Sequence, residues 1–112
     1  MAKIIVTFFV LLNVSIAFSE VIEFEIAAGT GSNAWNTQET TVNVRVGDIL
    51  RITNKDSEVH RLHTNGRPCS HGPDLLEGEI WDCEIQKTYD LESEGPLYDH
   101  YNDALFWLNA TE

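Results

Sequence analysis

Apolar residues alternate with polar ones along most of this chain, and this alternation restricts the possible folds more than any other feature. The segments 22–26 and 42–46 place every second side chain on one apolar face, as a half-buried β-strand does. Helix signals are scarce, and turn residues separate the further strands expected at 49–53, which the segment 59–64 can extend, and at 81–85, 97–101 and 104–109. Several short strands separated by turns predict a single all-β domain, a Greek-key sandwich or barrel.

The N-terminal segment has the composition of a secretory signal peptide. Lys3 precedes an apolar run over residues 4–12, and small residues follow at Ser15, Ala17 and Ser19. This run is shorter than the roughly 20 apolar residues that a membrane span needs. We therefore expect a signal peptide at 1–19 and one mature domain at 20–112, periplasmic or secreted and not inserted in the membrane.

The charge balance limits the choice of partners. The chain has 18 acidic and 7 basic residues, a formal net charge of −11. Nucleic acid is not an expected partner, because phosphates are bound mainly by lysine and arginine and the sequence has no basic cluster. Cations and basic protein surfaces are favoured, although an acidic surface also simply promotes solubility.

The two cysteines, Cys69 and Cys83, allow two interpretations. In an exported chain they would pair, and closing a loop of this length stabilises a protein by about 3 kcal/mol. Alternatively, Cys69 is a thiolate metal ligand, because it lies two positions before His71. The two interpretations exclude each other while the bridge stands.

The four histidines are the candidate metal ligands. His60, His63 and His71 are close in sequence, whereas His100 belongs to a distant predicted strand. Metal sites in β domains commonly combine such distant segments, so His60 and His100 are the first candidates, joined by His63 or His71. Imidazole suits both Cu(II) and Zn(II), and Cu(II) binds more tightly. Geometry and metal supply, rather than affinity, decide which of the two ions is bound, so the histidines alone leave both copper and zinc open as the cofactor.

Strand geometry complicates this ligand set. On an extended strand, His60 shares a face with Leu62 while His63 points the other way, so both can bind one ion only if the chain bends. Asp99 and Asp103 flank His100. These two aspartates either orient a metal-binding imidazole from behind or cover an exposed edge, and we expect the second role for both.

Three segments resemble the cupredoxins of the plastocyanin and azurin superfamily. The stretch Val46-Gly47-Asp48, residues 51–56 and His60 resemble the sequence leading to the first copper histidine of that family. Residues 76–79 and 95–100 resemble its penultimate turn and its ligand-bearing strand. The resemblance covers most of residues 20–110 and implies a cupredoxin fold with bound copper.

The sequence also departs from that family. Blue-copper members carry a cysteine near the position of His100, followed by a histidine and often a methionine, but here Tyr101, Asn102 and Asp103 follow. The resemblance therefore implies an all-nitrogen site suited to copper binding, sequestration or delivery, with a copper-delivery or redox protein as partner. The alternatives are a small electron carrier with a cysteine ligand and a metal-free interaction module.

No catalytic motif stands out in the sequence, so an enzyme is not expected. Small-oxidant chemistry at an open copper site is the enzymatic alternative.

Overall fold

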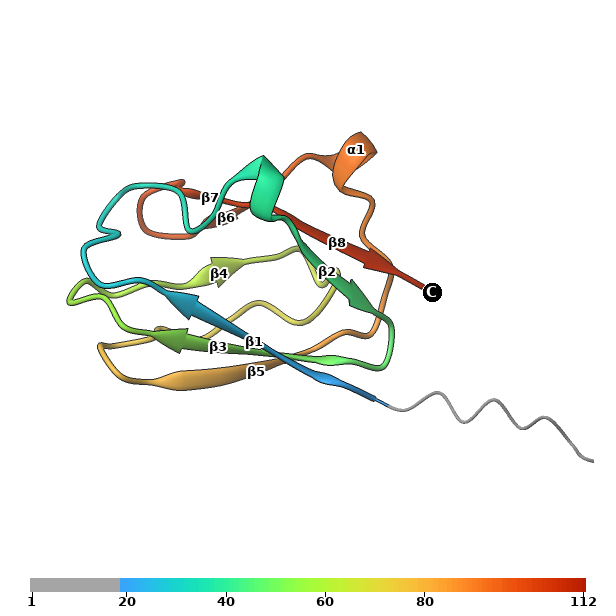
Figure 1. The fold of residues 1–112 in the computed structure, drawn as a ribbon, viewed down its shortest axis with the longest axis horizontal. Coiled ribbons are helices and arrows are strands. Elements are labelled where there is room, and N and C mark those ends of the chain that lie inside the picture. The colour runs from blue at the N-terminus through green and yellow to red at the C-terminus, as the bar shows by residue number, and fades with distance from the viewer. Residues whose placement is uncertain (1–18) are drawn as a thin grey trace, which may run out of the picture.

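The strands of this protein lie on two sides of one apolar core (Figure 1). The computed structural model describes residues 19–112. One sheet contains β1 (Val21–Ile26), β3 (Ile49–Asn54) and β5 (Ile80–Glu84). The other strands are two paired ones, β2 (Val42–Arg45) and β8 (Leu108–Thr111), and a second three-stranded sheet of β4 (Leu62–His63), β6 (Leu97–Asp99) and β7 (Leu105–Phe106).

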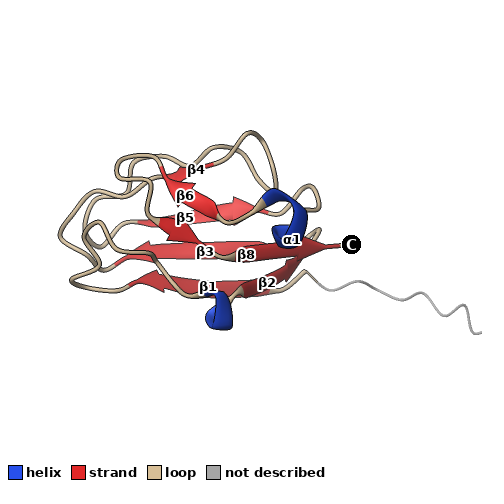
Figure 2. Ribbon diagram, turned by 90° about the horizontal axis from the view of Figure 1, so that it is seen from above, coloured by secondary structure: helices blue, strands red, loops and turns tan. Residues whose placement is uncertain are grey.

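Strands far apart in the sequence pair with one another. β1 runs parallel to β3, and β2 runs parallel to β8, whereas β3–β5, β4–β6 and β6–β7 are antiparallel. The only helical segments described are a 3-10 turn at Gln38–Thr40 and the four-residue α1 (Leu91–Glu94), drawn in blue in Figure 2. The prediction of an all-β sandwich is confirmed.

The core follows from the alternation in the sequence. Along β3, half-buried residues alternate with fully buried ones, and Leu50 and Ile52 have no exposed surface. Phe106 is also fully buried, and its ring lies 4.8 Å from Phe24 and 5.2 Å from Trp35 between centroids. Each large apolar side chain buried in this way stabilises the fold by about 1.5–3 kcal/mol.

A disulfide joins Cys69 to Cys83, with their Cα atoms 5.7 Å apart. Cys83 lies on β5, so the bond ties the long loop between β4 and β5 to the first sheet. No free cysteine remains in the described part of the chain. The predicted pairing is confirmed, and the alternative in which Cys69 is a thiolate ligand is wrong.

The expected signal peptide at 1–19 lies outside the described residues, apart from Ser19. Within residues 19–112, no helix is both long enough and apolar enough to cross a membrane.

Candidate metal centre

Three of the four histidines lie together. His63 is on β4, His71 is in the loop between β4 and β5, and His100 follows directly after β6. Their possible ligand atoms all lie within 4.8 Å of one another. We call His63, His71 and His100 the histidine cluster.

The spacing within the histidine cluster suits a shared metal ion. Nε2 of His71 lies 3.0 Å from Nδ1 of His63, and Nδ1 of His100 lies 3.5 Å from that same nitrogen. Two nitrogens that each bind one ion at about 2.0–2.1 Å can be at most about 4.2 Å apart. Both of these separations fall inside this limit, whereas the ligand atoms of the whole cluster spread over up to 4.8 Å, so the rings have to move slightly closer together to bind one ion.

A backbone contact determines which ring nitrogen of His71 carries the proton. Its Nδ1 donates a hydrogen bond to the carbonyl oxygen of Gly72 at 3.0 Å, which leaves the lone pair of a neutral ring on Nε2. That nitrogen faces His63. A hydrogen bond of this kind on the far side of a ring is typical of metal-binding histidines.

Gly72 also holds the loop close to β4. Its N–H donates to the carbonyl of Leu62, and a Cβ atom at this position would lie 3.2 Å from that same oxygen and 3.2 Å from Trp81. The carbonyl of Gly72 accepts a further hydrogen bond from Nε of Arg61 at 2.6 Å. The absence of a side chain therefore lets the segment that carries His71 pack directly against the strand that carries His63.

His63 belongs to an outward-facing row on the second sheet. It is paired with Tyr98 on β6, and Tyr98 is paired with Leu105 on β7. The ring of Tyr98 stacks on that of His63, with 4.6 Å between centroids and 17° between planes. Tyr98 and Leu105 are each 38% exposed. The histidine cluster is thus reached from the outside of the sandwich.

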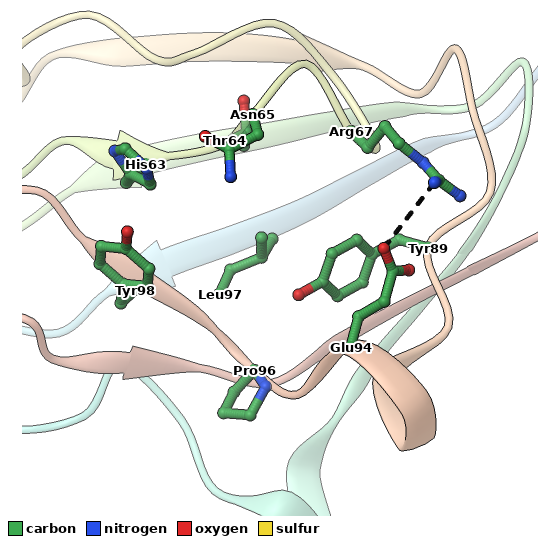
Figure 3. Close-up of a pocket in the computed structure, with 9 residues that line it drawn as sticks. All are labelled: His63, Thr64, Asn65, Arg67, Tyr89, Glu94, Pro96, Leu97 and Tyr98. Atoms are coloured by element: carbon green, nitrogen blue, oxygen red, sulfur yellow. Dashed lines mark ion pairs between the residues drawn. The ribbon is translucent and has the colours of Figure 1, made fainter.

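A pocket of about 330 Å³ adjoins this row (Figure 3). His63 and Tyr98 line one end, and Arg67 and Glu94 line the other, 3.8 Å apart as an ion pair. Thus His63 both belongs to the histidine cluster and lines this pocket.

His60 lies elsewhere. It is fully buried, and both ring nitrogens contact carboxylates: Nδ1 binds Asp99, and Nε2 binds Asp56 at 2.7 Å. The structure therefore does not bring His60 together with the other three histidines, since neither of its ring nitrogens faces them. The alternation along the strand separates them, as His60 points inward and His63 outward.

The expectation that Asp99 covers an exposed edge is wrong. It has no exposed surface, and its carboxylate also accepts hydrogen bonds from the backbone N–H of Tyr101 at 2.9 Å and from the Trp35 indole at 3.3 Å. Asp103 is exposed, as expected. The two aspartates on either side of His100 thus have different roles, because Asp99 is on the inner face of β6.

Structural comparison relates the fold of this chain to known folds. Comparison with protein-family models and with curated proteins gives no match. Among solved structures, a purple cupredoxin from Nitrosopumilus maritimus is similar, with 17% identity, a TM-score of 0.57, and coverage of 80% of this chain and 98% of that one. This chain has a cupredoxin-like fold.

Two amicyanin structures give the same result. A methionine-to-alanine variant with Cu(I) has 17% identity and a TM-score of 0.56 over 80% of this chain and 81% of that chain. An oxidised proline-to-glycine variant has 12% identity and a TM-score of 0.57 over 88% of this chain and 87% of the other. The predicted cupredoxin resemblance is therefore confirmed for the fold.

Within this cupredoxin-like chain, sequence reasoning missed three residues around the histidines. Gly72 and Tyr98 carry no sequence signal of their own, because their roles depend on close contacts across strands. Asp56 lies four positions before His60, and that spacing was the one available signal. The pKa of Asp56 is lowered to about 2, chiefly because His60 donates a hydrogen bond to it.

Proposed function

We propose that this cupredoxin-like chain is an exported copper-binding protein that holds one copper ion on His63, His71 and His100. The observation that carries the proposal is the convergence of three imidazoles with ligand atoms within 4.8 Å of one another. The lone pair of a neutral His71 ring faces His63, as binding of a shared ion requires.

The donor set favours copper. Three imidazole nitrogens bind Cu(II) more tightly than other divalent first-row ions, with Zn(II) the main competitor. The net charge of −11 attracts cations to the molecule. A copper ion held by these three histidines would be able to bind a further small ligand.

Copper handling is supported over electron transfer. Both cysteines are used in the disulfide, and residues 19–112 contain no methionine, so the described part of the chain offers the cluster no sulfur ligand. A blue-copper electron-transfer centre depends on a cysteine thiolate. An outward-facing site without sulfur suits binding, sequestration or delivery, in which a partner protein takes the ion by ligand exchange.

Export is supported by two observations. The sequence begins with the features of a signal peptide, and structural disulfides persist mainly in oxidising compartments. We propose that the mature protein acts in the periplasm or outside the cell.

A titration with Cu(II), followed by visible absorption, tests the proposal. We expect one equivalent to bind and give a weak d–d band without an intense thiolate band. His63→Ala, His71→Ala and His100→Ala should each weaken binding by at least tenfold, whereas Asn43→Ala on the exposed side of β2 should leave it unchanged. Binding that none of the three histidine variants affects would contradict the proposal, and no protein-dependent band would favour the metal-free interaction module.

A further inference from the structure

A buried row of three ionisable side chains lies inside the sandwich next to the turn that carries His100. His60 is in the middle, with Asp56 on Nε2 at 2.7 Å and Asp99 on Nδ1. The exposed fractions are 0% for His60, 2% for Asp56 and 0% for Asp99. We call these three residues the buried triad. Each ring nitrogen of His60 thus has one carboxylate as its hydrogen-bond partner.

Stability alone does not account for the buried triad. Replacing buried ion pairs by apolar side chains of similar size is often neutral or stabilising, because burying the charges costs as much as their attraction returns. What such a group does provide is a single geometry, since each member has fixed partners.

The Asp99 end of the triad fixes the backbone around His100. The carboxylate of Asp99 accepts the N–H of Tyr101 at 2.9 Å and the N–H of Arg61 at 3.4 Å, and the N–H of His100 donates to the carbonyl of Arg61 at 2.7 Å. His100 therefore lies between Asp99, which carries this carboxylate, and Tyr101, whose N–H donates a hydrogen bond to it. Within the same turn, the N–H of Asp103 donates to the carbonyl of Asp99.

The Asp56 end anchors the triad to the rest of the domain. Its two carboxylate oxygens accept the N–H groups of Gly29 and Gly31, each at 2.9 Å. The triad thus connects the loops that follow β1 and β3 with the turn between β6 and β7, all at the same end of the sandwich (Figure 1). A shift of His60 or Asp99 would be transmitted to the turn that carries His100.

We propose that His60 and Asp99 are positioning residues for copper: they hold the turn after β6 so that His100 faces His63 and His71. This inference rests on the proposed copper site. It assigns to His60 a role in copper binding that does not require it to touch the ion. Residues behind metal ligands typically change metal affinity by 10–100-fold when they are replaced.

A double-mutant cycle tests the proposal. Copper affinity is measured by competition with a Cu(II) chelator for Asp99→Asn, for His100→Ala and for the double variant, with the unfolding free energy of each apo form measured alongside. We expect Asp99→Asn to weaken copper binding by 10–100-fold. In the background of His100→Ala, the same substitution should cause little further loss, because its effect acts through His100.

Two further variants keep this test decisive. Asp48→Asn is the matched control, since Asp48 is also buried and accepts two backbone N–H groups, from Glu20 and Arg45, at the other end of the sandwich. It should lower stability without changing copper affinity. His60→Gln replaces Asp99→Asn if the latter does not fold, with the same expectation.

The outcomes separate the two proposals. If His100→Ala does not weaken copper binding, the proposed copper site itself is wrong. The positioning role is overturned if His100→Ala weakens copper binding but Asp99→Asn and His60→Gln leave it at the wild-type value. It is also overturned if the effects of Asp99→Asn and His60→Gln simply add to that of His100→Ala. In both cases the buried triad is structural only.

Discussion

At the scale of single residues, the direction in which each histidine points decides its role. His60 and His63 are three positions apart, and successive side chains of an extended strand point to opposite faces. The sequence therefore predicted that the two would not share an ion without a bend, and the structure has His60 fully buried and His63 facing outward.

The partners of His60 were beyond sequence reasoning. Asp99 is 39 positions away from His60, and nothing in a single sequence indicates that their side chains meet. The resemblance to cupredoxins suggested His60 as a ligand because that family has its first copper histidine there. The contacts with Asp56 and Asp99 use both of its ring nitrogens instead.

Asp56 should make the fold sensitive to acid. Its pKa is lowered from 3.8 to about 2 in the folded protein, first because of the hydrogen bond from His60 and then because of the N–H groups of Gly31 and Gly29. A folded pKa below the unfolded one stabilises the protein above about pH 4, and this contribution is lost as the pH falls through about 2. Asp56→Asn should therefore remove part of the decrease in unfolding free energy between pH 4 and 2, as measured by urea denaturation.

The exposed variant Glu77→Gln is the control for this experiment. It should keep the wild-type dependence on pH. Equal dependence on pH in Asp56→Asn and in the wild type would mean that Asp56 is not ionised in the way the structure implies.

At the scale of elements, the strands were predictable and the loops were not. The alternation located β1, β2, β3 and β5 closely, because each has one face on the core and one toward solvent. The predicted strand 59–64 is reduced to β4, Leu62–His63, with His60 in an isolated bridge to Leu75. The short α1 was missed, since four residues carry no helical periodicity.

The disulfide should support both the fold and the metal site. Replacing Cys69 and Cys83 together by alanine removes a link across 14 positions, which we expect to lower the unfolding free energy by about 3 kcal/mol. His71 lies two positions after Cys69, so copper binding should also weaken toward that of His71→Ala. Urea denaturation and copper titration of the double variant measure the two effects.

Unchanged copper affinity in that variant would contradict this account of the loop. It would mean that the hydrogen bonds of Gly72 to β4 and Arg61 hold His71 in place without the disulfide.

At the scale of the whole molecule, the fold depends on local sequence patterns, whereas the candidate site depends on contacts between segments that are distant in the sequence. The sandwich follows from alternation, turn residues and the resemblance to cupredoxins, all of which are local in the sequence. The histidine cluster depends on three segments meeting: β4, the long loop held by the disulfide, and the turn after β6. The sequence supplied all three histidines as candidates, but only their arrangement in space separates them from His60.

The central claim is that His63, His71 and His100 hold one copper ion together, and pulsed electron paramagnetic resonance of the Cu(II) protein tests it most directly, because the spectrum counts the coordinated imidazoles. The account predicts three imidazoles in the wild type, two in each of His63→Ala, His71→Ala and His100→Ala, and no intense thiolate absorption. A wild-type count below three, or a count that stays the same when these histidines are replaced one at a time, would contradict it.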